Sequence, residues 1–227
     1  MRNEIEAALK ASPAGYTEIR LEKRIATTVA YRGQDLEMAS TVLDAGGIVR
    51  CLCHAGGWGV STFNDRDDLA AMVDQAYQGA KLVHVDNPIQ LAPTPVVEVC
   101  VTSSLDKDFR GLALEEKKSL IEEYNALALK YDDRIVDTNS VYRDGFTQTT
   151  FANSEGSYIE EERPMVTVFV QVSARSGDDV QSAWESLSGP RGFELVEGRH
   201  DLAQVAAQRS VALLSAESVQ GLSLIHI

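Results

Sequence analysis

The sequence contains one cluster of residue types that bind metals, Cys51-x-Cys53-His54. Zinc sites usually separate two cysteines by two to four residues and take a second pair of ligands from elsewhere in the chain. Here a single residue separates the cysteines, so both would lie on one face of a β-strand. Because cysteine is among the residue types most often buried, we interpret Cys51 and Cys53 as small buried side chains of a sheet.

A cysteine nucleophile would need a histidine from another part of the fold as its base. His84 and His200 are available, but each falls at the end of a predicted helix, where a histidine usually caps the helix or faces solvent. No third group that would orient such a base is apparent. The glycine-rich run Ala55-Gly56-Gly57-Trp58-Gly59 lies between two predicted strands, whereas a phosphate-binding loop of the dinucleotide type requires a helix directly after it. We interpret this run as a hairpin.

Three consecutive acids, Glu160, Glu161 and Glu162, have the side chains needed for paired-carboxylate chemistry. They precede Arg163 and Pro164 in a segment predicted to be an edge strand, where charges and proline commonly prevent pairing with other chains. We interpret them as protection of that edge. Taken residue by residue, the sequence predicts no catalytic, cofactor-binding or metal-binding residue.

The stretch from Gly145 to Val172 surrounds a polar corner, Asn153-Ser154-Glu155-Gly156. Asp144-Gly145 predicts a tight hairpin, since this pair tolerates the positive φ angles of a two-residue turn. Gly156 predicts a second turn, and the apolar run from Met165 to Val172 predicts a strand covered on both faces. Turn chemistry explains the corner as scaffold, while a role in lining a peptide groove or a subunit contact stays open.

The spacing of apolar residues predicts helices alternating with antiparallel strands. Tyr16 begins a long half-buried strand whose polar face carries Glu18, Arg20, Glu22 and Arg24. The predicted helices are residues 1–12, 64–83 with Asn64-Asp65 as the cap, 114–130 and 201–216. Predicted turns fall at 32–35, 46–47, 55–57 and 189–192. The fold class is therefore α+β, with antiparallel sheets packed against helices in two consecutive helix–strands–helix units.

A segment with three prolines, Asn87 to Pro95, predicts a linker between those units. We expect an N-terminal α+β domain at residues 1–86, a proline-containing linker region at 87–108 and a central α+β domain at 109–221.

The formal net charge of −13 arises from 34 acids against 21 Lys and Arg scattered along the chain. This balance argues against a nucleic-acid partner, which would need clustered positive charge. No segment approaches the ~18 to 20 apolar residues of a membrane span, and the N-terminus lacks the apolar core of a signal peptide. The three cysteines fit a reducing, cytoplasmic setting better than a disulfide scaffold.

Several longer segments together resemble one known family. The N-terminal segments YTEIRLEKRIATTVAYRGQDLE and DAGGIVRCLCHAGGWGVSTF resemble the first domain of the TldD/PmbA family, and FANSEGSYIEEERP and WESLSGPRGFELVEG resemble its central region. The resemblance covers about Tyr16 to Gly221. It implies a cytoplasmic zinc metallopeptidase that cleaves unfolded or modified peptides. A TldD-type catalytic subunit typically pairs with a PmbA-type subunit that lacks the metal, so we expect a homo- or heterodimer with a family partner subunit.

In that family a His-Glu-x-x-x-His helix and a later cysteine, all in a C-terminal domain, hold the zinc. The spacing places both histidines on one helix face, with the Glu positioned to activate water. This sequence contains no His-Glu pair, and His226 is followed only by Ile227. We therefore expect a fragment that ends before the metal site, binds no zinc by itself and is inactive alone.

The last six residues, Leu222 to Ile227, match the translation of a common transposase-type sequencing adapter, and we expect them to be an artefact. The leading hypothesis is the N-terminal and central part of a TldD-type zinc metallopeptidase. The alternatives are a PmbA-type partner subunit without the metal, and a separate peptide-binding module that captures extended chains by strand addition.

Overall fold

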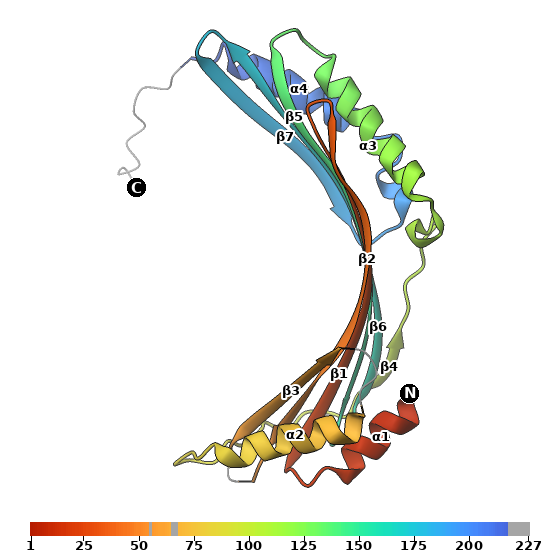
Figure 1. Ribbon diagram of the computed structural model, residues 1–227, viewed down its shortest axis with the longest axis vertical. Coiled ribbons are helices and arrows are strands. Elements are labelled where there is room, and N and C mark those ends of the chain that lie inside the picture. Colours follow the sequence, from red (N-terminus) through yellow and green to blue (C-terminus); the bar gives the residue numbers. More distant parts are fainter. Residues whose placement is uncertain (55, 65–67, 218–227) are drawn as a thin grey trace. The chain divides into compact units, whose positions relative to one another are not determined.

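The computed structural model describes residues 1–54, 56–64 and 68–217, and within them it confirms the predicted α+β class (Figure 1). The strands are β1 (Tyr16–Arg32), β2 (Asp35–Leu52), β3 (Trp58–Asn64), β4 (Glu98–Val101), β5 (Ile135–Asn153), β6 (Tyr158–Ser176) and β7 (Asp179–Gly189). The helices are α1 (Arg2–Ala11), α2 (Leu69–Leu82), α3 (Leu114–Leu129) and α4 (His200–Leu213), with 3₁₀ turns at Phe109–Gly111 and Phe193–Leu195. The described part of the chain has no helix long and apolar enough to cross a membrane. The predicted artefact at Leu222 to Ile227 lies outside the described residues.

The strands form one sheet in the order β3-β2-β1-β5-β6-β4, and β7 also pairs with β6. β2 and β3 are antiparallel, as are β6 and β7. The short β4 is parallel to the first residues of β6, from Tyr158 to Glu161. One parallel pair therefore joins a sheet that was predicted to be antiparallel throughout.

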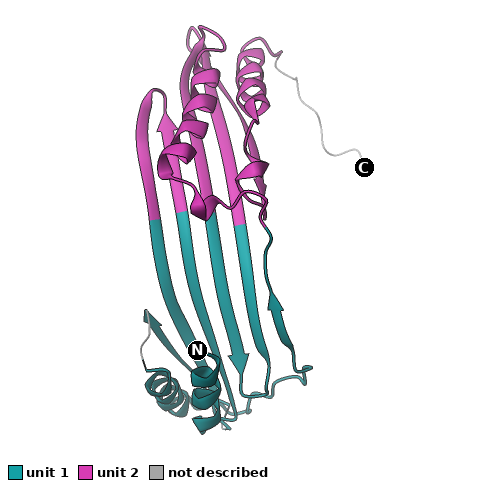
Figure 2. Cartoon of the chain, turned by 90° about the vertical axis from the view of Figure 1, so that its right-hand side faces the viewer, with its two compact units in different colours: residues 1–26, 42–104, 145–164 teal, residues 27–41, 105–144, 165–227 magenta. Residues whose placement is uncertain are grey.

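The chain forms two compact units, each made of three segments (Figure 2). Unit 1 comprises residues 1–26, 42–104 and 145–164, and unit 2 comprises 27–41, 105–144 and 165–227. The long strands β1, β2, β5 and β6 contribute residues to both units. The compact units are thus not the consecutive segments 1–86 and 109–221. Those boundaries stay a prediction about sequence modules.

In unit 1, helices α1 and α2 pack against each other, and α2 packs on β3. The core joins Ile5 and Leu9 of α1 and Val73 of α2 to Ile19 and Val49 of the sheet, all of them buried. α2 begins at Leu69, and its cap is Asp68, whose side chain accepts the backbone N–H of Ala70 at 2.9 Å. Of the predicted cap, Asn64 belongs to β3 and Asp65 lies outside the described residues.

In unit 2, helices α3 and α4 pack together, and α4 packs on β7. The core of this unit includes four fully buried valines of β6, Val166, Val168, Val170 and Val172. The residues between them are only partly buried. The strand from Met165 to Val172 therefore has one covered face, and the prediction of two covered faces was wrong.

Two predicted turns are absent because the strands continue through them. β2 runs unbroken across Gly46 and Gly47, and β5 runs across Asp144 and Gly145. A Cβ on Gly47 would lie 2.3 Å from Cζ of Phe63, so this glycine leaves room for a buried ring of the neighbouring strand. Gly46 and Gly47 indicate close packing between neighbouring strands rather than a change of chain direction.

Candidate functional site

The two cysteines of the metal-like cluster are buried between the sheet and α2, as predicted. Cys51 Sγ lies 3.7 Å from the carbonyl oxygen of Val73 and 3.5 Å from Oγ1 of Thr17. Cys53 Sγ lies 4.0 Å from the carbonyl oxygen of Tyr77. Burial raises the pKa of both thiols, so each favours its neutral form and is poorly suited to bind a cation.

The candidate histidines belong to no metal-binding group among the described residues. His54 and His84 are exposed. His200 begins α4, where its Nε2 lies 2.8 Å from Oε1 of Glu123 and its ring meets Tyr124 edge-on. Among the described residues, no group of three or more His, Cys, Asp or Glu side chains is arranged to hold a metal ion. The residues present therefore do not fit a zinc site.

Each of the three consecutive acids has a different hydrogen-bond or ion-pair partner. Glu160 accepts the hydroxyl of Tyr158 at 3.0 Å, and Glu161 lies 3.5 Å from the guanidinium of Arg163. Glu162 accepts both the backbone N–H and the hydroxyl of Ser103 at 3.0 and 3.3 Å. Since Glu160 and Glu161 pair with β4, this part of β6 is not a sheet edge, and its prediction as an edge was wrong.

The polar corner is a turn that also attaches β5 to β1. Gly156 adopts φ +102°, and its N–H donates to the carbonyl of Asn153 at 3.1 Å. The side chain of Asn153 accepts the N–H of Ser157 at 2.9 Å. Ser154 exchanges two hydrogen bonds with Thr17, donating its N–H at 2.8 Å and accepting through its hydroxyl at 3.0 Å. These contacts support the scaffold interpretation of the corner.

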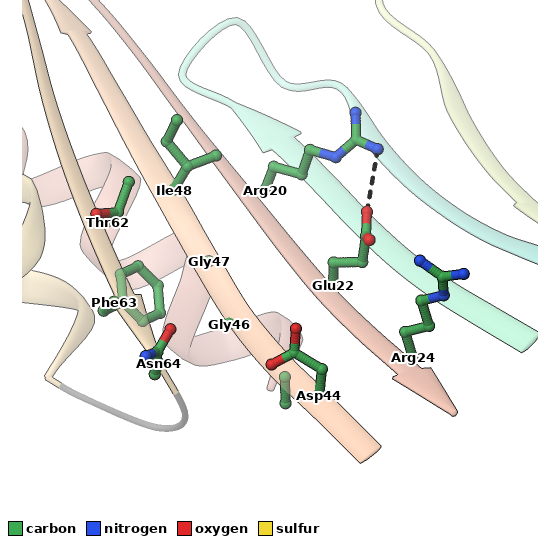
Figure 3. Close-up of a pocket in the computed structure, with 11 residues that line it drawn as sticks. Arg20, Glu22, Arg24, Asp44, Gly46, Gly47, Ile48, Thr62, Phe63 and Asn64 are labelled. Atoms are coloured by element: carbon green, nitrogen blue, oxygen red, sulfur yellow. Dashed lines mark hydrogen bonds and ion pairs between the residues drawn. The ribbon is translucent and has the colours of Figure 1, made fainter. Parts of the chain in front are cut away.

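A groove of about 330 Å³ lies on unit 1, across strands β1, β2 and β3 (Figure 3). It is bordered by the polar residues of β1, because these alternate with Ile19 and Leu21, which face the helices. Gly46 and Gly47 of β2 are part of the lining and add no side chain to it. The lining residues are Arg20, Glu22, Arg24, Asp44, Ala45, Gly46, Gly47, Ile48, Thr62, Phe63 and Asn64.

Charges of both signs line the groove. Nη2 of Arg20 lies 3.4 Å from Oε2 of Glu22, and Arg163 approaches the same oxygen at 4.0 Å. Arg24 forms no ion pair with any of the described residues. Its Nη2 lies 3.7 Å from the position that a Cβ on Gly145 would take, so the guanidinium lies over a residue without a side chain. Arg24 is thus available to an added carboxylate or carbonyl group.

The groove is suited to binding rather than to chemistry. Its lining contains no cysteine, serine or histidine, and one of its two carboxylates, Glu22, forms an ion pair with Arg20. The sequence analysis identified the polar row of β1 but missed the groove. The signal was present in Gly46-Gly47, which was interpreted as a turn. The two glycines instead lie within strand β2, where they add no side chain to the groove.

Solved structures share this fold. A proposed modulator of DNA gyrase from Bacteroides thetaiotaomicron is 19% identical, with a TM-score of 0.79 over 96% of this chain and 50% of its own. A second proposed modulator of DNA gyrase, from Thermotoga maritima, is 14% identical with a TM-score of 0.78 over 96% of this chain and 49% of its own. TldE from Thermococcus kodakarensis is 17% identical with a TM-score of 0.72 over 93% of this chain and 47% of its own. At these identities the likeness concerns the fold alone.

Sequence comparison identifies the family. The model of the PmbA/TldA metallopeptidase domain 1 matches residues 17–80, and that of the PmbA/TldA metallopeptidase central domain matches 107–214. A metalloprotease of Synechocystis sp. is 32% identical over 92% of this chain and 45% of its own length. A metalloprotease of Methanothermobacter thermautotrophicus is 26% identical over 88% of this chain and 44% of its own length. The chain belongs to the PmbA/TldA (TldD/PmbA) metallopeptidase family, and it spans about half the length of the curated relatives it matches.

Proposed function

We propose that these residues are the first and central domains of a longer TldD-type zinc metallopeptidase that acts on unfolded or modified peptides in the cytoplasm. One observation carries the proposal. Relatives named metalloproteases align with nearly the whole chain, yet the chain spans only 45% of the first of them. The two matched models are those of domain 1 and the central domain, and the described residues offer no metal site of their own. In this proposal, zinc and catalysis belong to a domain that follows residue 221.

The groove on unit 1 suits a role in holding the peptide. An unfolded peptide presents main-chain carbonyls and scattered charges, and the groove offers Arg24 as a donor together with the acids Glu22 and Asp44. An open polar surface of this kind binds many sequences weakly. We propose that it positions extended peptides for a catalytic centre supplied elsewhere in the full-length protein.

Reading the codons downstream of Gly221 at the genomic locus tests the domain assignment. A His-Glu-x-x-x-His run in the same reading frame supports the peptidase. A complete C-terminal domain without that run instead supports the PmbA-type partner subunit. A natural stop codon directly after Ile227 contradicts both and leaves the separate peptide-binding module.

The catalytic part of the proposal is tested on the full-length protein with an unfolded fluorogenic peptide. Cleavage that a chelator abolishes and zinc restores is expected, and the chain of 227 residues by itself should not cleave. For the groove, Arg24→Ala in the full-length protein should raise KM with little change in kcat. Lys23→Ala is the matched control, because the adjacent side chain of a strand points to the other face. Equal effects of the two variants would contradict a peptide-holding role for the groove.

A further inference from the structure

Helix α3 of unit 2 makes two buried polar contacts, and each of them reaches both β1 and β5. The first is centred on Lys117, which forms an ion pair with Asp144 of β5 and donates to Oγ1 of Thr27 on β1. Asp144 also accepts the backbone N–H of Thr27 at 3.3 Å, so each of the three residues contacts the other two. All three are at most 5% exposed. We call this set the Lys117 contact.

The second set, the Asn125 contact, lies about two turns further along α3. Oδ1 of Asn125 accepts the hydroxyl of Thr138 on β5 at 2.7 Å, and its Nδ2 donates to the carbonyl of Gly33 at 2.7 Å. Gly33 directly follows β1, and its N–H donates to the carbonyl of Thr138 at 2.9 Å. The side chains of Asn125 and Thr138 are buried, where a lost hydrogen bond is costly.

The two contacts report the same alignment of β1 with β5. Thr27 and Gly33 are six residues apart, and Asp144 and Thr138 are six residues apart in the opposite direction of the chain. Helix α3 therefore holds an antiparallel strand pair at two points that lie about 20 Å apart along the strands.

The alternation of β5 does not by itself fix this alignment. Its row toward α3 consists of four buried polar side chains, Thr138, Ser140, Tyr142 and Asp144. A shift by one residue would turn this row away from the helix, but a shift by two residues keeps every side chain on its own face. The partners of individual side chains must therefore distinguish the native register from a register shifted by two.

Ser140 makes one such shift compatible with the Asn125 contact. Ser140 is completely buried, and its Oγ has no hydrogen-bond partner among the described residues. In a register shifted by two, this hydroxyl takes the place of the Thr138 hydroxyl next to Asn125. The Asn125 contact can thus be satisfied in either register.

The Lys117 contact cannot be satisfied in the shifted register. The same movement brings Phe146 to the position of Asp144, since these residues are two apart on β5. Lys117 would then keep its buried ammonium group without a carboxylate, which is strongly unfavourable. The ion pair therefore excludes a register that the Asn125 contact would accept.

We propose that Lys117 and Asp144 form a register lock, whose ion pair selects the native alignment of β5 with β1 and α3 over the alignment shifted by two residues. A buried charge serves this purpose because the competing arrangement leaves it unpaired. The lock consists of buried side chains of unit 2, and it is independent of the proposed peptidase function.

Cross-strand disulfides report the register. Since Thr27 lies opposite Asp144, their neighbours Thr28 and Arg143 oppose each other on the face away from α3. In the shifted register Thr28 opposes Gly145 instead, where an added Cβ would have no atom closer than 3.7 Å. Opposed residues have Cα atoms about 4.5–5.5 Å apart, which a disulfide spans, whereas diagonal neighbours are about 7–8 Å apart.

The native reporter is Thr28→Cys with Arg143→Cys, and the shifted reporter is Thr28→Cys with Gly145→Cys. Both are made in a Cys100→Ser background, which removes the exposed native thiol. On brief oxidation of the otherwise unmodified chain, the native reporter should close and the shifted reporter should stay open. Lys118→Met is the control variant, because it removes a neighbouring lysine outside the lock, and it should leave this result unchanged.

Moving the acid by two positions tests the lock directly. The exchange variant, Asp144→Phe with Phe146→Asp, keeps the composition and offers Lys117 a carboxylate only in the shifted register. The shifted reporter should now close and the native reporter should stay open. Circular dichroism shows whether the variant is folded. A folded exchange variant that closes only the native reporter would overturn the lock.

A second variant tests the lock without moving a charge. The apolar variant, Lys117→Met with Asp144→Leu and Tyr142→Phe, removes the penalty on the shifted register, so the closed fraction of the shifted reporter should rise at least roughly tenfold. Adding Ser140→Ala should reverse most of this rise, because the shifted register then offers Asn125 no hydroxyl. A shifted reporter that closes no more often than in the unmodified chain would contradict the lock.

Discussion

Lys117 Nζ lies 2.6 Å from Oδ2 of Asp144, and both side chains are almost completely buried, at 5% and 2% exposure. The lysine reaches from α3 to β5 and also donates to Oγ1 of Thr27 on β1 at 3.1 Å. Asp144 further accepts the hydroxyl of Tyr142 at 2.6 Å. One ion pair thus connects a helix of unit 2 to two strands of its sheet, at the point where the sequence predicted a hairpin.

Replacing Lys117 with methionine should destabilise the protein by about 3–5 kcal/mol, because the carboxylate of Asp144 is left buried without its counter-ion. The free energy of unfolding from urea denaturation measures this. Lys118→Met is the control, since Lys118 pairs with the exposed Glu115 at 3.4 Å, and it should cost less than about 1 kcal/mol. Similar losses from both variants would contradict a specific role for the buried pair.

Removing Asp144 as well should restore only part of the lost stability. In the double variant Lys117→Met with Asp144→Leu, neither charge of the buried pair remains. The hydroxyl of Tyr142, however, loses its acceptor in a fully buried position. Adding Tyr142→Phe should recover most of the remainder. A double variant as unstable as Lys117→Met alone would show that the loss comes from packing and not from the unpaired charge.

The protein should lose stability as pH rises above 10, and two tyrosines of unit 1 should account for part of this loss. Burial, followed by the hydrogen bond to Glu18 at 2.8 Å, raises the pKa of Tyr16 to about 12. Burial, followed by the hydrogen bond to Glu160, raises the pKa of Tyr158 to about 12. Because the folded pKa lies above the unfolded value of 10.0, this contribution is complete below pH 10 and disappears as pH rises toward 12.

Denaturant unfolding at a series of pH values measures this loss, and phenolate absorbance follows the ionisation directly. Tyr16→Phe combined with Tyr158→Phe should reduce the slope above pH 10 without removing it, because burial also raises the pKa of Tyr31, Tyr124 and Tyr142. Tyr131→Phe, at a tyrosine that is 43% exposed, is the control for the loss of a hydroxyl group. A slope that the double variant does not alter would contradict the assignment to these two residues.

The helices and the positions of most strands could be predicted from the sequence because these elements have a consistent apolar period, whereas β4 lies in the predicted linker region 87–108 and all four of its residues are exposed. The predicted helix at 114–130 matches α3, and the turn at 32–35 joins β1 to β2. Where a glycine lay in an extended stretch, the sequence could not distinguish a turn from a close approach between strands. Gly156 forms a turn with positive φ, whereas Gly47 leaves room for Phe63, and the difference depends on a residue in another strand.

The buried ion pair was equally inaccessible from the sequence. A lysine in an amphipathic helix normally faces solvent, and Lys117 stands among acids that do so. Its burial depends on a carboxylate from a strand nearly thirty residues later in the chain. The groove was missed for a related reason, because its lining combines residues of three strands, β1, β2 and β3, that lie side by side only in the folded sheet.

Replacing Gly47 with alanine should destabilise the protein by about 1–3 kcal/mol, because the new methyl group overlaps the ring of Phe63 and the side chain of Leu21. Thermal or urea unfolding measures the change. Gly111→Ala is the matched control, since nothing lies within 4 Å of the added Cβ, and its effect should be near zero. Phe63→Leu combined with Gly47→Ala should lose less than the sum of the two single variants. Strict additivity would show that the two residues do not compete for space.

One thiol per chain should react rapidly with an aromatic disulfide reagent at neutral pH. Cys100 is exposed on β4, while Cys51 and Cys53 are buried and burial raises the pKa of both, which suppresses the reactive thiolate. In denaturant all three thiols should react at once. Cys100→Ser should abolish the rapid phase in the folded protein and leave two thiols after unfolding. Rapid reaction of two or more thiols in the folded state would show that α2 opens readily from the sheet, since its residues Val73 and Tyr77 cover Cys51 and Cys53.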